Sequence, residues 1–206
     1  MEQTEKKKKN KTGLALIAVG LILIAAAGAL YLFNTLTDKK AGNTAVQIAE
    51  EVLEAAQKND AAPAVAQEDG RMPEIDIDGV KYIGIISIPS LDVILPVQAD
   101  WSLEKLRTSP CRYTGSIDED SMIICAHNYR THFGRLHLLS AGDMVYFTDA
   151  SHLTYMYKVS YTERIDSYAS EEMTAPGSWD LTLFTCNYNG SARTTVRLVR
   201  SLGTAQ

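Results

Sequence analysis

The sequence predicts a mainly β domain, a barrel or a sandwich, that follows an N-terminal membrane-spanning helix. Residues 13–33 form a run of 21 residues without a charge. From residue 75 onward, short β-type runs recur every 8–15 residues, separated by turn residues and with little helical periodicity between them. The hydrophobic content of 46% indicates a chain that folds, and the net charge of −5 gives no reason to expect a nucleic-acid partner.

The uncharged run is long enough to cross a membrane. At about 1.5 Å per residue, a helix over 13–33 spans a hydrocarbon core of ~30 Å. Residues 1–12 carry five lysines against two glutamates, so we expect a cytoplasmic basic tail with the rest of the chain outside. The alternative is a cleaved signal peptide with an A-x-A-like site at 25–27. The apolar run continues past that site to Phe33, which favours an uncleaved anchor.

Residues 34–74 are expected to form an extracellular helix and a linker. Apolar residues at helical spacing predict one helix over about 44–58. These residues are Ala45, Ile48, Val52, Leu53 and Ala56. Residues 61–74 are rich in alanine, proline and glycine, which indicates a linker. The folded extracellular domain is therefore expected over 75–206.

The domain contains several runs that are typical of strands. They lie at 81–98 (two apolar segments around Pro89-Ser90), 121–128, 142–149, 153–165, 181–186 and 193–200. No internal repeat is visible in the sequence. Runs of this length and spacing favour a β-barrel or a β-sandwich.

The last two runs predict a hairpin over the turn sequence NYNGSA. Because side chains alternate with period two, Cys186 shares one face of its strand with Thr182 and Phe184. Arg193 then lies across from Cys186. Arg197 lies four residues further along, about 13 Å away at the strand rise. Arg193 is therefore the arginine expected to reach the thiol, and Arg197 stays as the alternative.

Cys186 is a candidate nucleophile. The chain has three cysteines, so at least one is left over from any internal pairing outside the cytoplasm. A cysteine nucleophile needs an acid/base partner, and His127 directly follows an apolar strand, as Cys186 ends one. The other histidines lie in polar or turn segments; they are His132, His137 and His152. No Cys/His spacing indicates a zinc site, and we expect no metal or other cofactor.

A structural role for the same residues stays open at this point. Free cysteine is among the most buried residue types, and a lone histidine at a strand end is more often structural than catalytic. The alternative to an enzyme is therefore a membrane-tethered extracellular β-domain that binds wall polymer or peptide, with Cys186 buried. The discriminating property is the accessibility of the thiol.

The segment TLFTC, residues 182–186, matches the TLxTC motif of the sortases, the membrane-anchored cysteine transpeptidases of Gram-positive surfaces. YIGIISIPSLDVILPV resembles the opening strands of sortases, and SPCRYTGS resembles the segment before the histidine. AHNYRTHFGRLHLLSAGDMVYF resembles the passage from the histidine to the following Gly-Asp turn and strand. The likeness covers about residues 80–200, is nearest to class B or class D-like members, and implies a closed sortase β-barrel with short helices.

The resemblance also implies a mechanism. Cys186 would attack the backbone carbonyl of a sorting-signal peptide in a surface protein and form a thioester acyl-enzyme. His127 would protonate the leaving amine and then deprotonate the incoming one. Arg193 would donate hydrogen bonds to the substrate carbonyl or oxyanion, and Thr185 would help to shape the site. An amine of the cell wall precursor, or of another protein, would then release the acyl group.

Other enzyme classes fit less well, and two details stay open. An L,D-transpeptidase-like enzyme is disfavoured by the residues before Cys186, and a papain-like hydrolase by the order of His127 and Cys186. Cys111 and Cys125 either pair in a disulfide or stay reduced as apolar filling. Some sortases bind calcium, so the resemblance leaves a calcium site open, but the lone acidic cluster at 118–120 is more often a solvated turn.

Overall fold

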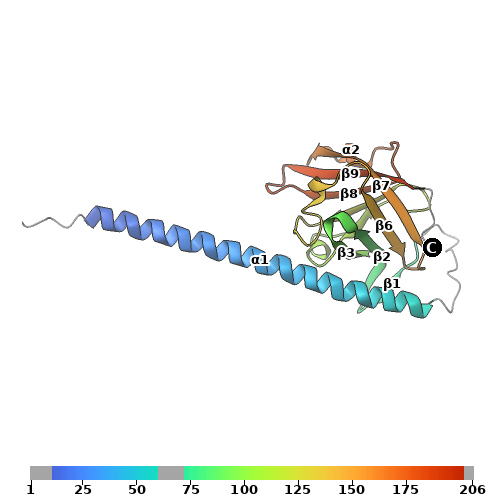
Figure 1. Cartoon of the computed structure of the whole chain (residues 1–206), viewed down its shortest axis with the longest axis horizontal. Coiled ribbons are helices and arrows are strands. Elements are labelled where there is room, and N and C mark those ends of the chain that lie inside the picture. The colour runs from blue at the N-terminus through green and yellow to red at the C-terminus, as the bar shows by residue number, and fades with distance from the viewer. Residues whose placement is uncertain (1–10, 60–71, 202–206) are drawn as a thin grey trace, which may run out of the picture. The chain divides into compact units, whose positions relative to one another are not determined.

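The computed structural model describes residues 11–59 and 72–201 (Figure 1). The chain divides into two compact units, Met1–Thr37 and Asp38–Gln206. The basic tail expected over 1–12 and the linker expected over 61–74 lie mostly outside the described residues. The β domain and the last part of the first helix belong to the second unit.

The first helix, α1, runs from Lys11 to Asn59 without a break. It is the one helix among the described residues that is long and apolar enough to cross a membrane, judged by length and composition. The separate helix predicted over about 44–58 is therefore the end of a longer one. The reason is local: residues 34–43 contain no proline, and the single Gly42 costs a helix only about 1 kcal/mol.

The second unit is built on a closed β-barrel (Figure 1). Its strands are β1 (Ile75–Ile77), β2 (Val80–Ile88), β3 (Val93–Gln98), β4 (Cys111–Thr114), β5 (Met122–Ala126), β6 (Met144–Asp149), β7 (Thr154–Asp166), β8 (Leu181–Cys186) and β9 (Ala192–Arg200). The order is β1-β2-β3-β4-β5-β8-β9-β7-β6, and pairing of β2 with β6 closes eight of these strands into a barrel. The barrel predicted from the sequence is confirmed.

Short helices connect the strands, as expected. They are η1 (Pro89–Leu91), η2 (Lys105–Arg107), η3 (Leu136–Leu138) and α2 (Ser170–Thr174). Two strands were not predicted from the sequence, β1 and β4. Both have only three or four residues, and β4 contains a register shift between Arg112 and Thr114, so neither shows a clear period-two pattern.

Side chains of alternate strand residues fill the barrel interior. The buried set includes Ile83, Ile86, Met122, Ile124, Phe147, Leu181, Leu183, Val196 and Leu198. A second, smaller cluster lies on the other face of β4, β5 and β8; it consists of Cys111, Ile123, Cys125, Ile165, Met173 and Phe184. We call this second set the outer cluster. The alternation means that one face of β8 fills the barrel while the other supports a surface site.

The end of α1 packs on the barrel. Small apolar side chains on one helix face are buried; they are Ala41, Ala45, Ala49, Val52 and Ala56. The residues Ala49, Val52 and Ala56 pack in a cluster with Tyr82 and Ile85 of β2. Of the apolar stripe predicted over this segment, Ala45, Val52 and Ala56 are buried, whereas Ile48 is half-buried and Leu53 is exposed. The buried face consists mainly of alanine, whose small side chain lets the helix backbone approach a strand closely.

Candidate active site

Three neighbouring strands bring His127, Cys186 and Arg193 together at one end of the barrel. β5 and β8 are parallel with Ala126 opposite Thr185, so the next residues, His127 and Cys186, are neighbours across the two strands. β8 and β9 are antiparallel with Cys186 opposite Arg193. Adjacent strands lie about 4.8 Å apart, so the three residues form one row with Cys186 in the middle. We call it the strand-end row.

Cys186 is exposed, unlike the other two cysteines. Cys111 and Cys125 face each other across β4 and β5 inside the outer cluster, and all three thiols are free. Burial raises the pKa of Cys111 to about 12 and also raises the pKa of Cys125. The two buried thiols are therefore poor nucleophiles, because the thiolate is the reactive form. Of the three thiols, only that of Cys186 is exposed to solvent.

His127 is half-buried and is held by the two residues that follow it. Its Nδ1 donates a hydrogen bond to Oδ1 of Asn128 at 2.9 Å. This bond fixes the proton on Nδ1 and leaves Nε2 to exchange a proton with a reacting group. The ring of Tyr129 stacks on the imidazole. The sequence analysis did not predict that Asn128 and Tyr129 contact the imidazole. The only signal for these contacts was their position directly after His127.

Arg193 is fixed by the loop between β7 and α2. Its Nη1 donates to the backbone carbonyl of Ser167 at 2.6 Å. The guanidinium lies 5.9 Å from the ring centre of Phe184, which shares a strand face with Cys186. A half-buried guanidinium beside an exposed thiol is suited to stabilise negative charge that develops next to that thiol.

Arg197 lies away from the strand-end row. It pairs with Thr182 across β8 and β9, and only 1% of its side chain is exposed. Nε is 2.7 Å from Oε1 of Glu163, and Nη1 donates to Oγ1 of Thr182 and to the carbonyl of Met173. The guanidinium also lies 4.1 Å from the ring centre of Trp179. Arg197 therefore ties α2 to the barrel and does not contact the strand-end row.

Thr185 faces the barrel interior, one residue before the nucleophile candidate. It is 4% exposed, and its Oγ1 donates to the carbonyl of Ala126 at 2.9 Å. The bond joins β5 to β8 just below the strand-end row. The bond therefore ties the two strands together one residue before His127 and Cys186.

The other predicted candidates lie elsewhere. His132 is fully buried and His137 is exposed in η3, whereas His152 is half-buried with a positive φ of 64°. Asp120 of the acidic segment 118–120 pairs with Arg200 at 2.7 Å. Among residues 11–59 and 72–201, no group of three histidine, cysteine or acidic side chains is arranged to hold a metal ion.

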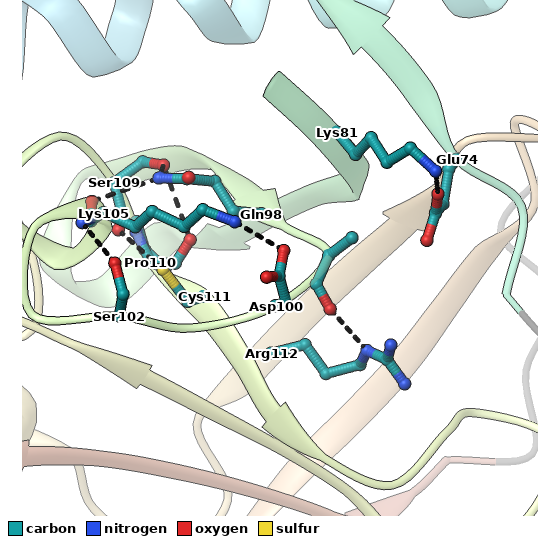
Figure 2. Close-up of polar contacts among 11 residues, drawn as sticks. Glu74, Lys81, Gln98, Asp100, Ser102, Lys105, Ser109, Pro110, Cys111 and Arg112 are labelled. Carbon is teal, nitrogen blue, oxygen red and sulfur yellow. Dashed lines mark hydrogen bonds and ion pairs between the residues drawn. The ribbon is translucent and has the colours of Figure 1, made fainter. Parts of the chain in front are cut away.

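The segment between β3 and β4 forms an ordered rim beside the outer cluster. Nε2 of Gln98 donates to the carbonyl of Lys105 and to Oγ of Ser109, and Nζ of Lys105 lies 2.6 Å from Oδ1 of Asp100 (Figure 2). Nε of Arg112 donates to the carbonyl of Ala99. The rim is therefore held by polar contacts at both of its ends.

Aromatic side chains lead from this rim towards Cys186. The ring of Trp101 lies 5.3 Å from that of Tyr113, and Tyr113 makes an edge contact at 5.4 Å with Phe184. A surface hollow of about 420 Å³ beside them is lined by Trp101, Tyr113 and Arg112 among others. Phe184 is buried in the outer cluster and lies on the same strand face as Cys186, two residues before it.

Comparisons with known proteins identify the same fold. The family model of the sortase domain matches residues 86–201, more than half of the chain. Sortase C of Streptococcus pneumoniae is 21% identical with a TM-score of 0.56, and the match covers 84% of this chain and 97% of that one. Sortase C1 of Streptococcus suis is 26% identical with a TM-score of 0.52, covering 60% and 75%.

A third solved structure, the sortase D5 transpeptidase of Clostridium perfringens, has the highest TM-score of these three. It is 15% identical with a TM-score of 0.60, and the match covers 75% of this chain and 99% of that one. None of the curated proteins compared matches the chain. The structural matches belong to several sortase classes, so they do not assign a class to this chain.

Proposed function

The chain belongs to the sortase family of cysteine transpeptidases, and from that premise we propose that it attaches surface proteins to the cell wall. The substrate would be a surface protein with a C-terminal sorting signal, and the acceptor an amine of the cell wall precursor. The observation that carries the proposal is the strand-end row, in which the exposed Cys186 has His127 on one side and Arg193 on the other.

The first half-reaction follows from that arrangement. The Cys186 thiolate attacks the backbone carbonyl carbon at the cleavage site, and the carbonyl oxygen becomes an oxyanion. Arg193 stabilises this charge with N–H donors. The tetrahedral intermediate collapses as the C–N bond breaks, and protonated His127 gives its proton to the leaving amine. The product is a thioester between Cys186 and the new carboxyl end of the surface protein.

The second half-reaction reverses these roles. Neutral His127 removes a proton from the incoming amine, which attacks the thioester carbonyl. The C–S bond breaks, an amide forms, and Cys186 leaves as a thiolate beside the protonated histidine. No cofactor is needed, because one peptide bond is broken and one amide bond is formed. The hydrogen bond from His127 Nδ1 to Asn128 supports both steps, since it keeps Nε2 available.

We place the catalytic domain outside the cell on a single-pass anchor. The uncharged run of α1, with exposed apolar side chains such as Leu16, Ile22 and Leu32, suits a lipid environment. The lysines of residues 1–12 favour a cytoplasmic N-terminus. Such an anchor would keep the enzyme beside membrane-bound precursors and newly exported proteins.

A peptide-library assay tests the function. We expect the full-length chain in detergent micelles, given an amine acceptor, to cleave and transfer a subset of sorting-signal peptides. Cys186→Ala should lower turnover by at least roughly 1000-fold, and His127→Ala nearly as much, because the two groups act as a unit. Cys111→Ala is the matched control and should keep most activity, since that thiol is buried in the outer cluster.

Alkylation of the cysteines distinguishes the proposed enzyme from the alternative, a non-catalytic β-domain. Iodoacetamide should label Cys186 in the native protein, and label Cys111 and Cys125 only after unfolding. A native protein that transfers no peptide, and whose Cys186 reacts no faster than a free model thiol, would instead favour a binding domain.

A further inference from the structure

The face of the His127 imidazole is covered by the ring of Tyr129. The two ring centres are 4.2 Å apart and the planes are 4° from parallel. On its other flank, Tyr129 makes an edge contact with His132, with centres 5.4 Å apart and planes at 67°. Tyr129 is thus packed between the strand-end row and a fully buried side chain.

The loop that carries these rings is tightly folded by its own backbone. The N–H of His132 and the N–H of Gly134 both donate to the carbonyl of Tyr129, at 3.0 and 2.9 Å. The N–H of Phe133 donates to the carbonyl of His127. A Cβ at Gly134 would lie 2.4 Å from the carbonyl oxygen of Asn128, so the turn needs glycine there. The position of Tyr129 is therefore set by the loop.

The loop is fastened in turn to α1. Oγ1 of Thr131 donates to Oδ1 of Asp38 at 2.6 Å, and the Thr131 N–H donates to the same carboxylate at 3.0 Å. A Cβ on Gly42 would lie 2.7 Å from Cβ of Thr131, so helix and loop are in close contact. Sequence separation gives no hint of this contact, because Asp38 and Thr131 are 93 residues apart.

We propose that Tyr129 is a positioning residue for His127, and that the Asp38–Thr131 contact makes α1 part of the same support. The proposal rests on the acid/base role of His127 given under Proposed function. The stacked ring restricts rotation of the imidazole, so that Nε2 stays directed towards the thiol and the substrate amine. Asn128 fixes the ring by one edge and Tyr129 fixes it by one face.

Loss of the stacked ring should slow the chemical step more than it weakens substrate binding. Small displacements of an acid/base group from its reacting geometry lower the rate of proton transfer. The interaction free energy of a favourable aromatic pair corresponds to a change of roughly 3- to 10-fold in an equilibrium constant. We therefore expect Tyr129→Leu to lower kcat by about that factor with KM little changed, and Tyr129→Phe to keep near-normal kcat because the ring remains.

The spectroscopic test does not depend on turnover. In the full-length chain in micelles with ¹³C-labelled histidine, the Tyr129 ring current should shift the His127 ring protons upfield. Tyr129→Leu should abolish this shift and slow alkylation of Cys186, whereas Tyr129→Phe should preserve both. The His127 signals are assigned with a His127→Gln variant. Equal His127 shifts in Tyr129→Leu and the unaltered chain would overturn the proposal, as would equal kcat in Tyr129→Leu and Tyr129→Phe.

Two further variants test the contact between Asp38 of α1 and Thr131 of the loop. Thr131→Val and Asp38→Ala should reduce the His127 ring-current shift and lower kcat several-fold, because the loop loses its fastening to α1. Glu50→Ala, on an exposed face of the same helix, is the matched control and should change neither. Full His127 shifts and unchanged kcat in both contact variants would refute the part assigned to α1. An intact shift in a chain that transfers no peptide would count against the proposed function and leave the stacking confirmed.

Discussion

Two arginines on β9 illustrate how the same residue type takes two roles four positions apart. Arg193 and Arg197 lie on the same face of the strand, opposite Cys186 and Thr182 respectively. Arg193 is half-buried beside the exposed thiol, whereas Arg197 is buried and saturated by a carboxylate, a hydroxyl and backbone carbonyls. The sequence-based preference for Arg193 agrees with this geometry, and its catalytic role stays a prediction.

Alanine variants should separate the two roles. Arg193→Ala should lower kcat/KM by roughly 100- to 1000-fold with an unchanged melting temperature, because it removes an oxyanion donor at the surface. Arg197→Ala should lower the free energy of unfolding by about 3 kcal/mol, because buried partners lose their donor. Activity per folded molecule of Arg197→Ala should remain within a few-fold of normal. Enzyme kinetics and thermal unfolding check both; a larger activity loss in Arg197→Ala would reassign the arginine.

At the scale of elements, β2 is central to closure of the barrel because it pairs with both β3 and β6. Its Gly84 has φ +148° at a register shift in the pairing with β3. A Cβ there would lie 2.2 Å from the carbonyl oxygen of Thr148 in the neighbouring part of β6. A glycine is therefore required where these backbones come closest.

Gly84→Ala should be strongly destabilising. We expect a loss of roughly 3 kcal/mol or more in the free energy of unfolding, because backbone on β6 must move to accept the methyl group. Gly79→Ala is the control: its φ of +80° is also positive, but a Cβ there meets open space. It should cost only about 1 kcal/mol. Denaturant unfolding distinguishes them, and equal losses would show that the close approach at Gly84 is not the cause.

At the scale of the whole molecule, the buried His132 couples the stability of the domain to pH. The side chain is fully buried and neither ring nitrogen has a hydrogen-bond partner among the described residues. Burial lowers the pKa of His132 from 6.5 to about 4, and the nearby Ala41 carbonyl opposes this shift only partly. In the unfolded chain the pKa of the His132 imidazole is near 6.5. Between about pH 4 and pH 6.5, the unfolded state therefore binds a proton at His132 and the native state does not.

The domain should therefore lose stability as the pH falls from about 6.5 to about 4. Over this window His132 contributes a loss of roughly 3 kcal/mol, and below it the contribution levels off because both states are protonated. His132→Phe should flatten the pH dependence of unfolding in that window. His137→Leu, at an exposed position, should not. Denaturant unfolding at several pH values measures the difference; parallel curves for His132→Phe and the unaltered protein would contradict it.

The sequence was informative wherever the signal is local. Seven of the eight barrel strands were foreseen from short β-type runs separated by turn residues, and the hairpin register that places Arg193 opposite Cys186 followed from one short turn. Strand β4 and the uninterrupted length of α1 were missed. Four residues with a register shift carry too little periodicity, and a single glycine does not end a helix.

The sequence by itself determined the barrel class, the candidate nucleophile and the histidine that ends a neighbouring strand, because strand periodicity and a short motif are local properties. Only the tertiary structure decided which cysteines are buried, that Arg197 contacts α2, and that Tyr129 stacks on His127 in a loop that contacts α1. These features depend on contacts between residues far apart in the chain, such as Asp38 with Thr131. Such contacts join residues that are distant in the sequence, so no local pattern along the chain predicts them.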